Sequence, residues 1–185
     1  MRSVGLFGGS FNPAHGGHLH VARAGLRQLQ LDEIWWLVSP QNPLKPEQPS
    51  WESRAATVSN LPLPPNMRIS DVELRYNTQY TVDLLTTLKV RRRNTNFVFM
   101  MGADNLLQLP QWRSWQTIME TVPIAVIARP GSSVRARLGQ ASRQFNHARI
   151  GENQAHTLKD RTAPAWTYLT LPLDKRSSSA IRASR

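Results

Sequence analysis

Short apolar segments alternate with amphipathic ones along most of this chain. The amphipathic segments carry apolar residues at the spacing of a helix, as in the stripe from Leu19 to Leu29 and the stripe from Val82 to Leu88. The apolar segments have the length and the residue types of buried strands. We therefore predict strands at residues 4–7, 34–38, 67–72, 97–101, 124–128 and 166–171, with helices between them.

This alternation is typical of one class of fold. Strands that alternate with helices at such spacing form a mainly parallel sheet with helices on both faces. A length of 185 residues suits a single hydrophobic core. We therefore predict an α/β fold with one Rossmann-like, doubly wound domain over residues 1–185. The polar, weakly patterned stretch 139–164 is expected to hold a helix remnant and a long surface connection.

The loop after the first predicted strand carries the strongest chemical signal, because ligands of parallel sheets bind beyond the carboxyl ends of the strands. It reads GGSFNPAHGGH over residues 8–18. Glycines let the backbone pass close to a ligand, and a helix that begins near Gly17 aims N–H groups and its positive dipole end at the same point. His15 and His18 can each donate a hydrogen bond to a phosphate oxygen there. The loop therefore predicts an anion site.

Three other interpretations of this loop fail on residue spacing. A phosphate loop of the GxxxxGK[ST] kind requires a lysine after its glycines, and none follows here. The dinucleotide fingerprint GxGxxG is not matched, and the histidines lack the glutamate of the zinc motif HExxH. A glycine-rich turn with two surface histidines remains as the alternative without chemistry.

The charge balance is consistent with a phosphate-rich substrate. Lysine and arginine total 23 against 12 acidic residues, which gives a net charge of +11. Such a balance fits nucleic acid, an anionic membrane or a small phosphorylated molecule. The charges are scattered, and the one tight run, at 91–93, falls at the end of a predicted helix, where it can face the negative end of the dipole. Without zinc-finger spacing or an aromatic RNA-binding motif, we expect no nucleic-acid partner.

The expected compartment follows from what the sequence lacks. No apolar stretch approaches the roughly 18 residues of a membrane span, and the start of the chain lacks the residue order of a secretory signal. Cysteine is absent, which excludes disulfides and thiolate chemistry. We therefore expect a cytoplasmic protein with no membrane partner.

The pattern GGSFNPxHxGH resembles the signature of the HxGH nucleotidyltransferase superfamily and, more narrowly, that of the bacterial nicotinate-mononucleotide adenylyltransferases. The resemblance extends over essentially the whole chain. It implies that residues 1–185 form a nucleotidyltransferase domain that transfers AMP from ATP to nicotinate mononucleotide in NAD biosynthesis. It also implies direct in-line transfer without an enzyme nucleophile. Mg²⁺ is expected to bridge phosphate oxygens and to keep several waters, so no protein residue is assigned to the metal.

Two further loops resemble phosphate-binding motifs of the same family. The segment PQNPLK at 40–45 is similar to PxxxPHK, with Leu44 where a histidine is common. The segment RSSSAIR at 176–182 is similar to ISSTxIR, with Arg176 in place of isoleucine. By this resemblance, the two segments bind the triphosphate together with the first loop.

Three more elements match the family pattern. GADN at 102–105 resembles the GxD element, although Asp104 could equally cap the helix that follows. The pairs of residues at 80–81 and 111–112 match the family's YT element and the end of its LPxW stretch. Arg54 matches a family arginine as well, but we expect it to be solvated like most surface arginines.

The resemblance implies roles for individual residues. The implied catalytic residues are His15, His18 and Lys45, with His18 on the α-phosphate. The implied residues for ATP and its phosphates are Gly8, Gly9, Ser10, Phe11, Gly102, Asp104, Ser178, Ser179 and Arg182. The implied residues for nicotinate mononucleotide are Asn12, Thr81, Trp112 and Arg113.

Two alternatives stay open. One is a sister nucleotidyltransferase with another phosphate acceptor, such as nicotinamide mononucleotide or pantetheine phosphate. The other is a basic protein without enzymatic activity that binds nucleic acid through a vestigial site. A homo-oligomer is compatible with the sequence, which does not determine the oligomeric state.

Overall fold

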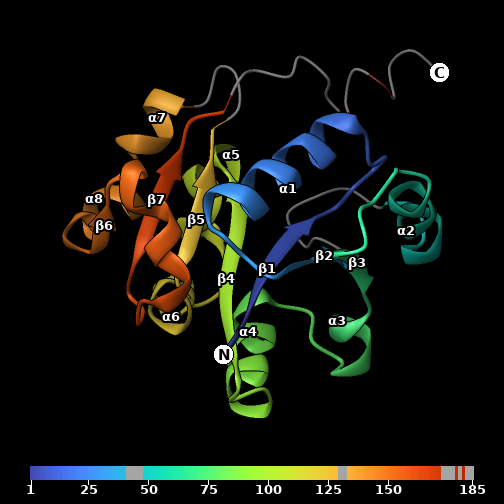
Figure 1. The fold of residues 1–185 in the computed structure, drawn as a ribbon, viewed down its shortest axis with the longest axis horizontal. Helices are drawn as coiled ribbons and strands as arrows, with labels where there is room; N and C mark the ends of the chain where they lie inside the picture. Colours follow the sequence, from blue (N-terminus) through green and yellow to red (C-terminus); the bar gives the residue numbers. More distant parts are fainter. Residues whose placement is uncertain (41–47, 129–132, 172–177, 179–180, 182–185) are drawn as a thin grey trace.

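The computed structural model of the protein describes residues 1–40, 48–128 and 133–171, together with 178 and 181. Within this part of the chain, strands form one seven-stranded sheet in the order β3-β2-β1-β4-β5-β7-β6 (Figure 1). All neighbouring strands in it run parallel, which confirms the predicted class of sheet. The strands are β1 (Arg2–Gly9), β2 (Glu33–Val38), β3 (Met67–Ser70), β4 (Thr95–Gly102), β5 (Ile124–Ile127), β6 (Arg149–Ile150) and β7 (Trp166–Leu169).

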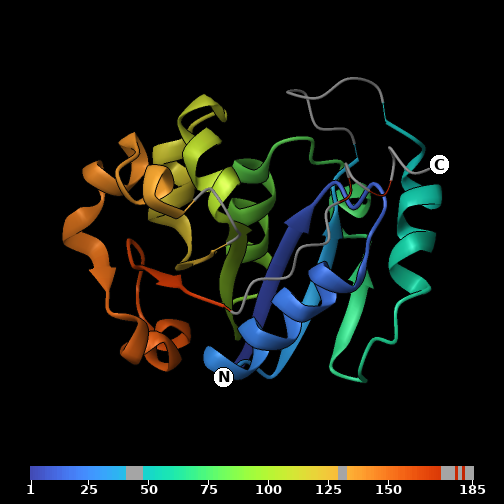
Figure 2. The same cartoon turned by 90° about the horizontal axis from the view of Figure 1, so that it is seen from above.

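Helices cover both faces of the sheet (Figure 2). One face is covered by α1 (Gly16–Gln28), α2 (Trp51–Ser59) and the 3-10 helix η3 (Glu152–Asp160). The opposite face is covered by α3 (Val72–Arg75), α4 (Thr81–Arg91), α5 (Ala103–Gln108), η1 (Leu109–Gln111), α6 (Trp115–Thr121), α7 (Ser133–Arg137), α8 (Gln140–Gln144) and η2 (Asn146–Ala148). Among the helices that the structure describes, none is long and apolar enough to cross a membrane.

The chain builds this sheet outward from its centre. It passes from β1 to β2 and β3 on one side and then returns to β4, β5 and β7 on the other. The order of the strands therefore reverses between β1 and β4. In open parallel sheets, ligands bind beyond the carboxyl ends of the strands at such a reversal.

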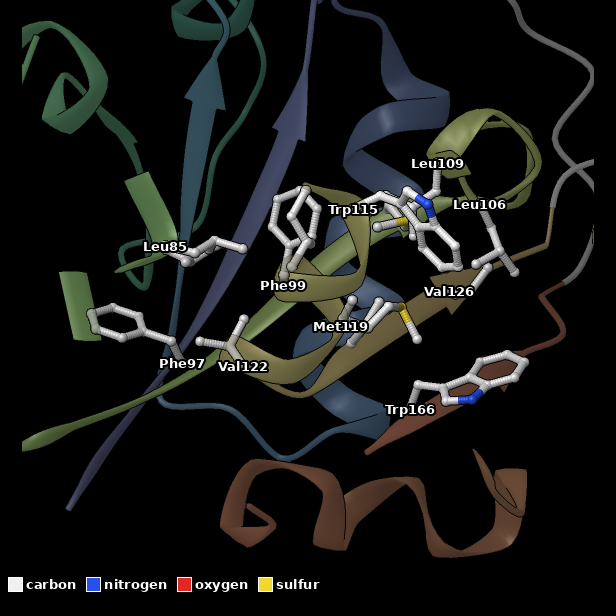
Figure 3. Packing of buried hydrophobic residues seen from close by; sticks show 14 of the residues in the cluster. Leu85, Phe97, Phe99, Leu106, Leu109, Trp115, Met119, Val122, Val126 and Trp166 are labelled. Carbon is white, nitrogen blue, oxygen red and sulfur yellow. The ribbon is translucent and has the colours of Figure 1, made fainter. Parts of the chain in front are cut away.

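Alternate residues of each strand supply two separate hydrophobic clusters, because successive side chains of a strand point to opposite faces. On β4, Phe97 and Phe99 belong to the cluster under α4 and α6, whereas Val98 and Met100 belong to the cluster under α1. Figure 3 shows the first cluster, in which Trp115 of α6 packs with residues of β4 and β5. These two clusters fix the sheet whose carboxyl ends carry the loops.

Some predicted strand boundaries are wrong. β3, β5 and β7 each end one or two residues earlier than expected, and Val72 begins α3 instead of ending a strand. The stretch 139–164 contains β6, which was not predicted, besides α8, η2 and η3. β6 escaped prediction because it is only two residues long and its Arg149 is exposed, so no apolar run marks it.

Replacing Leu85 by alanine tests the packing between α4 and the sheet. Leu85 is fully buried in the first cluster, so Leu85→Ala should lower the free energy of unfolding by about 2–5 kcal/mol. Val90→Ala on the same helix is the matched control, because Val90 is 60% exposed and its loss should change stability by no more than about 0.5 kcal/mol. Denaturant titration gives both values, and equal effects would contradict the described packing.

Candidate active site

β1 leads directly into the segment 8–18, which we call the glycine–histidine loop. The chain turns at Phe11, whose φ of 47° lies in the left-handed region. The Phe11 residue is only 3% exposed, and its ring packs against Phe7 and Trp36 with centroid distances of 5.4 and 5.1 Å. A Cβ atom on Gly9 would lie 2.9 Å from this ring, so the position requires glycine. The buried ring anchors the loop and leaves the Phe11 backbone for the predicted contact with ATP.

The two histidines cap the start of α1 together. The Gly17 N–H donates to Nδ1 of His15 at 3.1 Å, and the His15 N–H donates to Nδ1 of His18 at 3.3 Å. The two rings lie 4.0 Å apart between centroids, and each residue is 7% exposed. Because Nδ1 accepts in both rings, the proton of each neutral imidazole sits on Nε2. The cap uses Nδ1 of both rings, and an Nε2–H group is of the kind that can donate to a phosphate oxygen.

Helix α2 supports this loop through Arg54, which we expected to be solvated. That expectation is wrong, because Arg54 is 1% exposed and donates to four backbone carbonyl groups. It lies four residues before Val58 and next to Ala55, on the buried side of α2. This helical spacing was the one signal in the sequence that could have placed Arg54 inside.

A buried carboxyl group accompanies this arginine. Glu73 of α3 is 9% exposed, and its Oε2 has no hydrogen-bond partner among the described residues. Burial raises the pKa of the Glu73 carboxyl to about 8, while the positive charge of Arg54 opposes the rise. Burial also lowers the pKa of the Arg54 guanidinium, and the charge of Glu73 opposes that shift in turn. The two groups thus form an electrostatically coupled pair beneath the loops.

The GxD element lies at the carboxyl end of β4, beside the glycine–histidine loop. Parallel register pairs Phe7 with Met100, two residues before each strand ends at Gly9 and Gly102. Asp104 is exposed in the first turn of α5, and Gly102 occupies the N-cap position. The alternative in which Asp104 caps this helix is therefore wrong, and its carboxylate is available for other contacts.

Three of the four residues predicted to bind nicotinate mononucleotide, Thr81, Trp112 and Arg113, belong to segments that lie near the start of α4. This helix begins at Thr81, with Tyr80 as its N-cap residue. The Arg113 guanidinium lies 4.8 Å above the Tyr80 ring and 4.0 Å from the Asp83 carboxylate. Trp112 is half-buried against the first cluster. The structure thus brings Thr81 close to the segment of Trp112 and Arg113, as the sequence prediction requires.

Ser178, near the carboxyl end of the chain, contacts the glycine–histidine loop. The Ser178 hydroxyl donates to the Pro13 carbonyl oxygen at 2.9 Å, across 165 residues of sequence. This contact joins two of the predicted phosphate-binding segments. Three other predicted site residues, Lys45, Ser179 and Arg182, lie outside the described residues.

Comparison with known proteins agrees with this fold and site. Residues 6–184 match the cytidylyltransferase-like family, so the chain belongs to this class of nucleotidyltransferases. The solved structure of Plasmodium falciparum nicotinic acid mononucleotide adenylyltransferase complexed with NaAD has a TM-score of 0.74 to this chain at 19% identity, and the match covers 99% of this chain and 83% of that one. At this identity, the likeness concerns the fold alone.

Comparison with curated relatives identifies one family within this class of nucleotidyltransferases. A protein of Caulobacter sp. (strain K31) named "Probable nicotinate-nucleotide adenylyltransferase" is 50% identical over 97% of this chain and 96% of its own length. A protein of the same name from Parvibaculum lavamentivorans is 48% identical over 97% of this chain and 90% of its own length. The chain belongs to the nicotinate-nucleotide adenylyltransferase family, and the resemblance seen in the glycine–histidine loop is confirmed.

The buried Glu73 carboxyl should make stability depend on pH. Its pKa is raised in the folded protein to about 8 from an ordinary value of 4.5, so the folded state holds the proton more tightly than the unfolded state does. The contribution of this group to the free energy of unfolding is therefore fully present at about pH 4. It is lost as the pH rises to about 8, by on the order of a few kcal/mol. Glu73→Gln, which mimics the protonated acid, should remove this fall.

Denaturant titrations of both proteins between pH 5 and 9 measure the effect. The variant should gain stability relative to the unchanged protein as pH rises through this range. Glu120→Gln on the exposed surface of α6 is the control, because an exposed carboxyl should show no such trend. A difference between Glu73→Gln and the unchanged protein that stays constant with pH would contradict the raised pKa.

Proposed function

We propose that the protein transfers AMP from ATP to nicotinate mononucleotide, forming nicotinate adenine dinucleotide and pyrophosphate in NAD biosynthesis. The observation that carries this proposal is the double histidine cap of α1, which lies at the carboxyl end of β1 where the strand order reverses. Family membership over nearly the whole chain supports it. The acceptor phosphate attacks the α-phosphorus of ATP in line, its P–O bond forms, and the bond to pyrophosphate breaks.

The histidines act on the phosphates. We assign His18 to the α-phosphate and its transition state, and His15 to the neighbouring phosphate oxygens, each through its Nε2–H group. The remaining phosphate contacts belong to Lys45 and to Ser178, Ser179 and Arg182 of the carboxyl-terminal segment. The hydrogen bond between Ser178 and the Pro13 carbonyl supports that assignment, because it brings the Ser178 side chain to the glycine–histidine loop.

The remainder of ATP is assigned to the ends of the two central strands. Backbone groups of Gly8, Gly9, Ser10 and Phe11 line one side, and Gly102 with the exposed Asp104 carboxylate lines the other. Alignment and charge neutralisation are sufficient for this reaction, so no covalent intermediate with the enzyme is required.

The acceptor is assigned to the start of α4. Backbone N–H groups near Thr81 and Arg113 donate to the nicotinate carboxylate, and the positive end of the α4 dipole favours its negative charge. Trp112 borders the pyridine ring, and Asn12 of the glycine–histidine loop contacts the mononucleotide. The stacking of Arg113 on Tyr80 supports this assignment, because it holds the two segments together.

Magnesium is the metal that this chemistry calls for. Among the described residues, no three His, Cys, Asp or Glu side chains come together as a metal cluster. A Mg²⁺ ion in this reaction would take most of its ligands from phosphate oxygens and water. When bound, the ion neutralises charge on the triphosphate and on the departing pyrophosphate. The lack of cysteine in the sequence supports the further proposal of a reducing, cytoplasmic location.

Replacing His18 tests the catalytic assignment. His18→Ala removes the donor to the α-phosphate and should lower turnover by a factor of about 10² or more, with a smaller effect on ATP binding. His20→Ala is the matched control, since His20 lies on the same helix outside the assigned site. Pyrophosphate release measures turnover, and circular dichroism checks that α1 persists without the His18 cap. Turnover within a few-fold of the unchanged enzyme would remove His18 from the mechanism.

Acceptor choice tests the pyridine pocket. Backbone N–H groups satisfy a carboxylate but leave the NH₂ donor of nicotinamide unpaired, at a cost of roughly 1–3 kcal/mol. Nicotinate mononucleotide should therefore be preferred over nicotinamide mononucleotide by at least about tenfold in kcat/KM. Equal use of the two would show that the pocket is assigned wrongly. Use of pantetheine phosphate in place of either would instead favour the sister transferase.

A further inference from the structure

Three segments of backbone converge on one buried guanidinium. Arg54 of α2 donates from Nη1 to the carbonyl of Ser10 at 2.8 Å, and from Nη2 to the carbonyls of Ser39 and Pro40 at 2.7 and 2.6 Å. Its Nε donates to the carbonyl of Pro49 at 2.9 Å. Ser10 belongs to the glycine–histidine loop, whereas the other three residues follow β2 or precede α2. A single side chain thus joins three backbone segments, and the most distant contact, with Ser10, lies 44 residues from Arg54 in sequence.

The pattern of these bonds is specific. Ser39 and Pro40 stand directly after β2, and Pro49 stands just before α2, so Arg54 fixes both flanks of the connection between the two elements. Two further hydrogen bonds reinforce the arrangement. The Ser39 N–H donates to the Gly9 carbonyl at 3.1 Å, and the Trp51 indole N–H donates to the Val38 carbonyl at 2.8 Å.

The same helix holds the glycine–histidine loop at a second point. The Ala14 N–H donates to the Thr57 hydroxyl oxygen at 2.9 Å, one residue before the histidine cap of α1. Helix α2 therefore forms hydrogen bonds with this loop on both sides of Phe11, at Ser10 and at Ala14. Any movement of α2 would displace the histidines with it.

Arginine is the side chain that this arrangement needs. Its planar fork offers donors in several fixed directions, whereas the ammonium of lysine is a single point with three donors. Carbonyl oxygens that lost these donors would leave partly buried acceptors unsatisfied, which is costly. A buried cation is costly as well, and apolar packing in its place is often as stable. A contribution to stability is therefore a weak reason for an arginine at this position. Its ability to fix the distances between backbone segments is a stronger reason.

We propose that Arg54 is a positioning residue for nucleotidyl transfer, which sets the spacing between the glycine–histidine loop and the flanks of the β2–α2 connection. It touches no substrate, and it acts by holding the Ser10, Ser39 and Pro40 carbonyls at fixed distances around one plane. This inference rests on the proposed function to the extent that these loops hold the phosphates of ATP. Misplacement of reacting groups by about 1 Å can lower a rate by about 10².

Arg54→Lys provides the first test, because it keeps the charge and much of the stem but loses the fork. At a temperature where the variant is fully folded, KM for ATP should rise and kcat should fall, each by about tenfold or more. KM for nicotinate mononucleotide should change little, since the acceptor pocket lies at α4. Hydrogen exchange at the Ser39 amide should accelerate, because its bond to Gly9 depends on the same spacing.

Val58→Ala is the matched control. Val58 lies one turn further along α2, is fully buried and contacts neither loop segment through a hydrogen bond described above. It should lower stability by about 0.5–2 kcal/mol and leave both kinetic constants unchanged while the protein is folded. If Arg54→Lys does not fold, Arg54→Ala with added guanidinium replaces it. Guanidinium should restore turnover and ethylammonium, which lacks the planar fork, should not.

Several outcomes would overturn the inference. Unchanged kinetic constants in folded Arg54→Lys would overturn it, even if hydrogen exchange at the Ser39 amide became faster. The hydrogen bonds of Arg54 would then have a structural role only. Equal losses of activity in Arg54→Lys and Val58→Ala would overturn the inference as well, and so would equal rescue by the two cations. If the unchanged protein released no pyrophosphate with any acceptor, the proposed function would fail instead. In that case, calorimetric titration of the unchanged protein and of Arg54→Lys with Mg²⁺ and ATP tests the inference on Arg54 by itself. Equal ATP affinity of the two proteins would reject the positioning role.

Discussion

Helix α1 begins at a pair of histidines instead of the serine, threonine, aspartate or asparagine that usually takes this position. In each ring, Nδ1 accepts a hydrogen bond from a backbone N–H group at the start of the helix. A ligand that binds at Nε2 therefore does not compete with the bonds that start the helix. The capping bonds also set the orientation of both rings, so their donors are arranged before any phosphate arrives.

This start depends in turn on the segments packed around it. The Phe11 ring packs against Phe7 and Trp36 and so fixes the middle of the loop. Helix α2 holds the loop by hydrogen bonds from Arg54 and to Thr57. The parallel sheet places all of these groups at one edge, because the carboxyl ends of β1, β2 and β4 face the same way. The shape of the loop therefore depends on these surrounding groups as well as on its own capping bonds.

Sequence reasoning reached the features that are encoded locally. The periodicity of apolar residues predicted the parallel α/β fold, which is confirmed. The glycines and histidines of residues 8–18 predicted an anion site and indicated the family, of which the family is confirmed and the anion site stays a prediction. Features that depend on distant partners escaped it. Arg54 was expected on the surface because its carbonyl partners come from three separate segments, and only the folded chain brings them together. The burial of Glu73 likewise depends on neighbours in space, and the sequence of the short helix α3 does not predict it.

The direction of β1 has a practical consequence. The strand starts at Arg2 and ends at Gly9, so the first residue of the chain and the glycine–histidine loop lie at opposite edges of the sheet (Figure 1). At about 3.3 Å per residue, the strand separates them by roughly 25 Å. Met1 is also well exposed, at 87%. The amino terminus is thus the natural place to attach a fluorophore or a surface linker, since a group fixed there would leave the loop open to nucleotides.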